Sequence, residues 1–566
     1  MLPVAGKTTI ALHRIAYLIY NYEKEFRPDE FMIIAPTKFF LNYISNILPD
    51  LGVNDVKQYT FEDFAYDVIG KRLKISDNNE KLVMIVNNDI AKEYQGKVDV
   101  ILQESKFKSS IRFKRVIDEY LRYIEANYIP KEDFCYNGKT IMSYEDINEL
   151  FVSTYNMYNF SARINEIEKN LTYEFRKKSE EIIDDLKQKR SLAIEGLVGA
   201  KRVEVYESFE KEIKLIEKDY KKIIKDYLKK MPNKSCVDYY REFLEDYLEN
   251  NYEKQDVRQM GTVLISLKNE TKQDRPGKSQ MFEVIEYLRQ STLANLSKNE
   301  IAFEDLAPIM YLQYKINGIK EKARVKHVVI DEAQDYGEFQ FDVLKTILNS
   351  NSMTILGDIA QGVHYYRGIE NWQRFIDVEF SDVDATYTTL KKTYRTTKEI
   401  MDVANMVISK LPDYEKEFIV LGEPVIDRKN SINIQGKENM KELIEAVNER
   451  INEYLANNYK SIAIIGKDMS ECKELEKSLS KIRDDVKLIQ GKDSEYNAGI
   501  SIVPSYLAKG LEFDCVIISN ANNEKYEDNS LDKKLLYVTI TRAMSKLDVF
   551  YVGEITELLK EESINE

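Results

Sequence analysis

An apolar run that ends in adjacent carboxylates constrains this chain more than any other feature. Residues 325–335 read VKHVVIDEAQD, so that Asp331 and Glu332 directly follow an expected buried strand. Ligands of open α/β sheets bind where the carboxyl ends of parallel strands lie. A bare acidic pair is usually a solvated turn, but the full DEAQD favours a Mg²⁺ site. Asp331 would hold the ion through water, and Glu332 would orient or deprotonate an attacking water.

Short β-rich runs alternate with helical sequence at both ends of the chain, which indicates parallel sheets covered on both faces. The first set of runs lies at 31–37, 325–335, 353–358 and 385–390, and the second at 461–467, 486–491, 499–505, 515–519 and 546–552. We therefore expect an α/β fold with two cores. Residues 1–85 and 296–395 form the first core, 86–295 a helical insertion within it, and 396–566 the second core.

The insertion contains a long antiparallel helical hairpin. Charged helical sequence at 162–194 and 201–230 is separated by Gly196 and Gly199 and ends at Pro232. Each arm of the hairpin is expected to be about 50 Å long, at 1.5 Å per residue. A solvated coiled-coil spacer and a probe that reaches into a partner both fit this sequence.

The charge balance excludes a generally basic, nucleic-acid-binding surface. The 566 residues carry a net charge of −14, so a nucleic-acid contact has to be a local groove. No run of about 18 apolar residues occurs, and we expect no membrane association. The four cysteines are far apart and form no paired motif, which indicates a reduced, cytoplasmic compartment.

Gly6, Lys7 and Thr8 precede an apolar helical stretch and complement the acidic run. In a phosphate-binding loop, the lysine contacts the β- and γ-phosphates of ATP and the hydroxyl binds Mg²⁺. Phosphoryl transfer also needs cations that reach the nucleotide. Arg395 in KKTYRTTKEI and Arg542 in LYVTITRA are candidates, although each is equally well an ordinary surface arginine.

Eight short motifs follow one another between residue 6 and residue 543. They read GKT, APTKFF, YTFEDF, DEAQD, GDIAQGVHYYRG, TYRTTKEI, YLAKGLEFD and LYVTITRA. In this order they resemble the motif series of superfamily 1 helicases of the UvrD/Rep type. The resemblance implies an ATP hydrolase with two RecA-like, parallel-sheet P-loop NTPase domains that clamp one ATP with Mg²⁺, and single-stranded nucleic acid that crosses their tops.

The resemblance also assigns roles to single residues. Asp358 and Gln361 match the motif that senses the γ-phosphate. The expected catalytic residues are Glu332, Gln361, Arg395 and Arg542. The expected nucleotide-binding residues are Gly6, Lys7, Thr8, Gln334, Gly510 and Glu512, and the metal ligands are Thr8 and Asp331. Thr37 and Thr60 match positions that contact the strand, and Tyr366 matches an aromatic that stacks on a base, although a core tyrosine fits equally well.

Two departures from the UvrD pattern narrow the subfamily. Pro504 and Tyr506 stand where UvrD-type enzymes carry Thr-x-His, and IALHRIAYLIY, EDLAPIMYL and PSYLAKGLEFD resemble HelD, a bacterial helicase-like motor that binds RNA polymerase. Only 113 residues, 396–508, separate Arg395 from Lys509, so the large subdomain that UvrD-type helicases insert there has no room. We expect RNA polymerase as the partner of a monomeric protein, with single-stranded nucleic acid as a further ligand.

The phosphate-binding loop departs from the full pattern GxxxxGK[ST]. Counting back from Lys7 places the first glycine at Met1, and the alternative alignment on Val4-Ala5-Gly6 deletes two loop residues. Both alignments leave fewer backbone amides for the phosphates, so the chain resembles a family member truncated at its N-terminus, and we expect weak ATP binding. Three functions stay open: a HelD-like motor, a UvrD-type DNA repair helicase, and a non-hydrolysing remnant that binds RNA polymerase.

Overall fold

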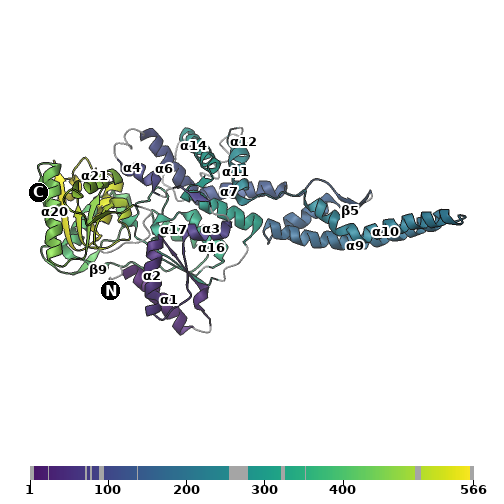
Figure 1. The fold of residues 1–566 in the computed structure, drawn as a ribbon, viewed down its shortest axis with the longest axis horizontal. Coiled ribbons are helices and arrows are strands. Elements are labelled where there is room, and N and C mark those ends of the chain that lie inside the picture. Colours follow the sequence, from purple (N-terminus) through teal and green to yellow (C-terminus); the bar gives the residue numbers. More distant parts are fainter. Residues whose placement is uncertain are drawn as a thin grey trace.

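Two separate parallel sheets organise the molecule (Figure 1). The structure is a computed structural model that describes residues 6–22, 25–70, 73–76, 79–87, 95–136, 138–253, 278–319, 325–350, 352–490 and 499–560. One sheet has the strand order β2-β1-β7-β8 and the other the order β11-β16-β15-β12-β14-β13. All strand pairs within both sheets are parallel, which confirms the expected α/β fold class with two RecA-like cores.

The first sheet is covered by helices on both faces. Its strands are β1 (Phe31–Ala35), β2 (Lys57–Thr60), β7 (His327–Ile330) and β8 (Met353–Ile355). Helices α1 (Gly6–Asn21) and α2 (Lys38–Asp50) pack on one face. Helices α3 (Phe61–Ile69), α16 (Glu338–Leu348) and α17 (Trp372–Glu379) pack on the other. Because both faces are covered, β1 and β7 are buried throughout, which explains their uninterrupted apolar sequences.

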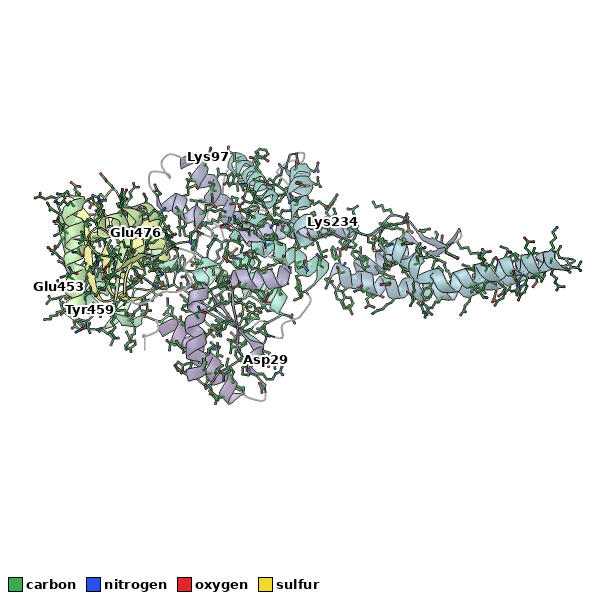
Figure 2. All side chains as sticks on the ribbon, viewed as in Figure 1. Asp29, Lys97, Lys234, Glu453, Tyr459 and Glu476 are labelled. Atoms are coloured by element: carbon green, nitrogen blue, oxygen red, sulfur yellow. The ribbon has the colours of Figure 1, made fainter. Side chains whose placement is uncertain are left out.

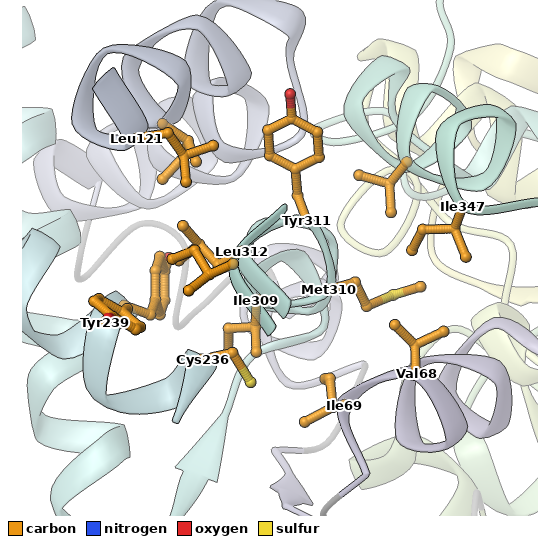
Figure 3. Close-up of a cluster of buried hydrophobic side chains, with 14 of the residues drawn as sticks. Val68, Ile69, Leu121, Cys236, Tyr239, Ile309, Met310, Tyr311, Leu312 and Ile347 are labelled. Atoms are coloured by element: carbon orange, nitrogen blue, oxygen red, sulfur yellow. The ribbon is translucent and has the colours of Figure 1, made fainter. Parts of the chain in front are cut away.

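Helix α15 (Leu306–Leu312) joins this core to the helical insertion. All seven of its residues are buried. In Figure 3, Met310 lies beside Val68 of α3, and Leu312 lies towards Leu121 and Tyr239 of the insertion. The first core and the base of the insertion therefore share one hydrophobic core.

The insertion is mainly helical. Helix α4 (Glu80–Val86) spans its expected start, and the further helices are α6 (Gln95–Lys108), α7 (Ile111–Ala126), α8 (Tyr144–Glu149), α9 (Phe160–Ala193), α10 (Ala200–Leu228), α11 (Cys236–Glu242), α12 (Leu248–Glu253) and α14 (Lys278–Ser297). Two short strands, β4 (Phe134–Tyr136) and β5 (Lys139–Met142), form an antiparallel pair near α9. A second small pair, of parallel strands, joins β3 (Lys74–Ile75) to β6 (Glu300–Ile301). The residue at which each core or the insertion begins stays a prediction.

Helices α9 and α10 form an arm that projects far from the rest of the molecule (Figure 1). Buried apolar residues run between the two helices, among them Phe175 and Ile182 of α9 and Ile216 of α10. Gly196 and Gly199, with φ of +78° and +63°, make the connecting turn. Charged side chains surround the arm along its length (Figure 2). The arm is thus held together by a narrow apolar seam and is otherwise solvated.

The second core holds the six-stranded sheet. Its strands are β11 (Ile432–Lys437), β12 (Ser461–Gly466), β13 (Val486–Leu488), β14 (Gly499–Pro504), β15 (Phe513–Ile518) and β16 (Ala543–Val552). Helices α20 (Met440–Ala456) and α21 (Met469–Leu479) cover one face, and α18 (Lys398–Ser409) and α22 (Ser530–Ile540) the other. Strands β9 (Lys392–Thr397) and β10 (Glu423–Ile426) form a separate parallel pair, and the short helix α19 (Asp413–Lys416) lies between them in the chain. Strand β9 spans the expected boundary between the cores.

One expected strand is wrong, and two strands of the two large sheets were not predicted. Residues 385–390 are exposed coil, and the nearest strand, β9, begins at Lys392. Alternating β-branched residues favoured a strand at 385–390, but no neighbouring strand pairs with it among the described residues. Strands β2 and β11 escaped prediction because they are sheet edges with polar sequences. Within the described part of the chain, no helix combines the length and apolarity that a membrane span requires.

Candidate active site

The carboxyl end of β7 brings an acidic pair against the first turn of α1. The Thr8 hydroxyl donates to Asp331 Oδ2 over 2.7 Å, and both residues are buried. Glu332 takes the left-handed conformation, with φ of +51°, which turns the chain sharply after the strand. A hydroxyl and a carboxylate oxygen side by side are ligands that suit Mg²⁺.

The two carboxyls of the pair differ in proton affinity. Burial and the charge of Glu332 raise the pKa of Asp331 to about 6. Burial also acts to raise the pKa of Glu332, but the charges of Lys509 and Lys7 hold it below its usual value. Asp331 is therefore the first of the pair to take a proton, and Glu332 stays an acceptor at neutral pH.

Gln334 supports Glu332 from inside the first core. Its Nε2 donates to Glu332 Oε2 over 2.6 Å, and its Oε1 accepts from the backbone N–H of Asp358 over 2.9 Å. The surrounding loop passes so close that a Cβ added at Gly368 would lie 1.9 Å from the Gln334 carbonyl oxygen. Gln334 is buried and does not line the cleft; it holds Glu332 in this structure, and its expected role as a nucleotide contact stays a prediction.

A chain of polar contacts crosses from the first core to the second. Lys7 Nζ lies 3.1 Å from Asp358 Oδ2, and the Gln361 amide donates to the same oxygen over 2.9 Å. Arg542, two residues after α22, donates from Nη2 to Gln361 Oε1 over 2.8 Å. The structure thus brings together Lys7, Asp358, Gln361 and Arg542, which lie far apart in sequence.

Two arginines stand together on the second side of the cleft. Arg395 Nε lies 3.2 Å from Glu512 Oε1, and its Nη2 donates to the Leu511 carbonyl, which also accepts from Arg542 Nη1. Burial, and then the charge of Arg395, lower the pKa of Arg542 to about 9. Both arginines contact the 511–512 segment, so neither is an ordinary surface arginine. Their mutual repulsion makes this corner of the cleft favourable for an anion.

Lys509 is a residue of this site that the motifs did not single out. Its Nζ donates to Asp335 Oδ2 over 2.6 Å and lies 3.3 Å from Glu332 Oε2. Lys509 thereby carries a cation from the second core to the acidic run of the first. The available signal was its position directly before Gly510 and Glu512, which were singled out.

One cleft collects most of the expected nucleotide and catalytic residues. It has a volume of about 1080 Å³, enough for a nucleotide with its metal. Its lining includes Lys7, Thr8, Asp331, Glu332, Asp358, Gln361, Arg395, Gly510, Glu512 and Arg542. Gly6 begins α1, and the rest of the expected phosphate-binding loop, Met1–Ala5, lies outside the described residues.

The cleft fits Mg²⁺ and a nucleoside triphosphate. Its oxygen donors are hard ligands, and its cations face them from the other side. Among the described residues, no group of three or more His, Cys, Asp or Glu side chains is placed to enclose a metal. A metal at Thr8 and Asp331 therefore has few protein ligands, which is how Mg²⁺ is commonly held beside phosphates.

The expected nucleic-acid contacts receive less support. Thr37 and Thr60 cap α2 and α3, where their hydroxyls accept from the N–H groups of Phe40 and Asp63. Tyr366 is only 2% exposed, because α4 and residues of the second core cover it, and its hydroxyl lies 3.0 Å from His364 Nδ1. The ring is therefore enclosed in this structure, and base stacking on Tyr366 stays a prediction.

Comparison with known proteins gives two matches to protein families. The family described as the UvrD/REP helicase N-terminal domain matches residues 3–377, and the UvrD-like helicase C-terminal domain matches residues 499–549. A probable DNA helicase II homolog of Mycoplasma capricolum is 30% identical over 220 residues, which are 37% of this chain and 29% of that protein. The ATP-dependent DNA helicase Rep of Buchnera aphidicola is 25% identical over 202 residues, 34% of this chain and 30% of that protein.

The matches to these two relatives thus span less than a third of each relative's length. A solved structure, the C-terminal domain of a possible DNA helicase from Lactobacillus plantarum, is 32% identical and covers 30% of this chain and 92% of its own. Its TM-score of 0.24 is too low for a comparison of folds.

Proposed function

Because the chain belongs to the UvrD/REP helicase family, we propose that it is an ATP-dependent superfamily 1 motor, similar to HelD, that acts on RNA polymerase complexes. The observation that carries the ATPase part is the cleft in which carboxylates of the first core meet cations of the second. The observation that supports the partner is the projecting arm of α9 and α10.

Each residue of the cleft has a distinct task in this proposal. Thr8 and Asp331 hold Mg²⁺, which neutralises phosphate charge when bound, and Lys7 contacts a phosphate oxygen. Glu332 accepts a proton from water or orients it, since its carboxylate is held by Gln334 and keeps a low pKa. The paired guanidinium groups of Arg395 and Arg542 stabilise the charge that develops on the transferred phosphoryl group.

The charge distribution favours a protein partner over free nucleic acid. Residues 160–228, which make up the arm, carry 16 basic and 15 acidic side chains, so the negative charge of the chain lies entirely on the remainder. That remainder repels a phosphate backbone, whereas the nearly neutral arm is free to enter a protein channel of either sign. Cytoplasmic location and a monomeric state belong to the same proposal.

Two other functions remain as alternatives. The names of the two relatives, DNA helicase II homolog and Rep, favour a UvrD-type DNA helicase. The second alternative is a protein that binds RNA polymerase through the arm but does not hydrolyse ATP. All three differ in which ligand binds and whether ATP is consumed, so one set of assays separates them.

The test measures binding of the whole chain to purified bacterial RNA polymerase and to a single-stranded oligonucleotide, both at physiological salt, together with ATP turnover. We expect tighter binding to the polymerase, and turnover that depends on Glu332. A matched variant lacks residues 184–213, which are replaced by a short glycine-rich turn, and keeps the base of the arm. This variant should lose polymerase binding. Tighter binding to the oligonucleotide would favour the UvrD-type alternative, and binding without turnover would favour the non-hydrolysing one.

A further inference from the structure

Helix α4, which spans the expected boundary between the first core and the insertion, packs against both cores. Its Leu82 and Val86 pack in one buried cluster with Val363 and Tyr366 of the first core. The same cluster contains Leu535 and Val538 of α22 in the second core. Arg542 Nε donates to the Val538 carbonyl over 2.9 Å, so the helix that positions Arg542 in the cleft rests directly on α4.

A buried network of charges continues from α4 into the insertion. Lys81 of α4 places its Nζ 2.9 Å from Glu104 Oε2 and 3.4 Å from Glu304 Oε2. Lys108 Nζ lies 2.7 Å from both Glu104 Oε1 and Asp305 Oδ1. These five residues, Lys81, Glu104, Lys108, Glu304 and Asp305, are called the charged network below. Apart from Lys81, none of their side chains is more than 2% exposed.

The charged network ends at the base of the arm. The Tyr240 hydroxyl donates to Asp305 Oδ1 over 2.8 Å, and both residues are buried. Tyr240 belongs to α11, the first helix after α10 of the arm. A continuous series of packed and hydrogen-bonded side chains therefore runs from α22 through α4 and α6 to α11.

We propose that α4 and the charged network couple closure of the cleft to the position of the arm. A shift of α22 moves the apolar cluster and with it α4. Lys81 cannot follow without changing buried ion pairs, and an unpaired charge at such a site is strongly unfavourable. The ion pairs are kept if α6 and α11, which support the arm, move together with α4. This inference takes from the proposed function only that the two cores move relative to each other.

Hydrogen exchange of the whole chain, followed by mass spectrometry, tests this coupling without any nucleotide. Lys509→Met removes the contacts of Lys509 with Glu332 and Asp335 and so loosens the cleft. Neither of these partners belongs to α4 or to the charged network, so the substitution does not disturb the proposed coupling path directly. We expect exchange in α11 and α6 to become at least about fivefold faster, the lower end of typical coupling between sites. When Lys509→Met is combined with Lys81→Met, the exchange rate of α11 should equal that of Lys81→Met alone.

A control variant and a substitute variant keep the test decisive. Arg450→Met removes a pair with Asp548 inside the second core, at 2.9 Å, and should change exchange only in that core. If Lys81→Met does not fold, Leu82→Ala interrupts the apolar side of α4 in its place. The coupling is overturned if Lys509→Met leaves the exchange rate of α11 unchanged. It is also overturned if Lys509→Met still accelerates exchange in α11 when Lys81→Met or Leu82→Ala is present. Because no nucleotide is used, these results are independent of whether the protein hydrolyses ATP.

Discussion

The two sides of the cleft carry opposite charge. The first core contributes Asp331 and Glu332 at the end of a buried strand, together with Lys7, which faces Asp358. The second side contributes Arg542, from the end of a helix, and Lys509, from a loop after β14. Each side alone is therefore an incomplete site for phosphate chemistry.

The two sides also differ in how their charged groups are held. The carboxylates follow a strand that is buried on both faces, and Gln334 holds Glu332 in place. The cations reach them across the boundary between cores, through single contacts such as that of Lys509 with Glu332. A relative movement of the cores thus changes the distance between the two charge sets without disturbing either set internally.

Loss of the buried arginine should have the largest effect on turnover. Arg542→Ala removes a guanidinium from the second side, and arginines in this role contribute about 10³–10⁵ in rate. Steady-state ATP hydrolysis measures the loss. Arg428→Ala is the matched control, because Arg428 is exposed in the same core and its Nη1 donates to Ser545 Oγ over 3.1 Å, away from the cleft lining. Equal rates of ATP hydrolysis in Arg542→Ala and wild type would show that Arg542 of the second core takes no part in the reaction.

Glu332→Gln should lower turnover by about 10²–10⁴, the usual contribution of a general base, while nucleotide binding is kept. The amide keeps the shape of the side chain but cannot accept the proton. Glu370→Gln, at an exposed carboxylate paired with Lys106, is the control. A variant that still hydrolyses ATP at the wild-type rate would show that the first core does not supply the base.

Much of this arrangement was predictable from sequence. Apolar runs predicted β1, β7, β12 and β14 because strands covered on both faces have uninterrupted apolar sequences. Motif order predicted that residues as distant as Lys7 and Arg542 share one cleft.

Other features were not predictable, for physical reasons. The edge strand β11 has a polar sequence, so no apolar pattern marks it. Burial of Tyr366 depends on α4, whose packing partners come from both cores. Likewise, the charged network joins residues as far apart as Lys108 and Asp305, and charged residues in sequence are ordinarily read as surface.

The acidic side should also respond to pH. With a pKa near 6, Asp331 is protonated in about nine of ten molecules at pH 5, so Mg²⁺-dependent nucleotide binding should weaken about tenfold between pH 7 and pH 5. Since the folded-state pKa is raised, the stability from this carboxyl is present below its ordinary pKa and is lost as pH rises through 6. Titration calorimetry at several pH values measures the binding. Asp331→Asn should bind weakly with no such pH dependence.

The central claim is that nucleotide binds between these two charge sets. Trp372, the single tryptophan of the chain, lines the same cleft and packs against Gly357, one residue before Asp358. Energy transfer from Trp372 to a fluorescent ATP analogue therefore reports binding at this place. We predict sensitised emission that saturates, is displaced by unlabelled ATP, and disappears in Lys7→Ala and Trp372→Phe. Saturable binding of the analogue without any transfer from Trp372 would contradict the account.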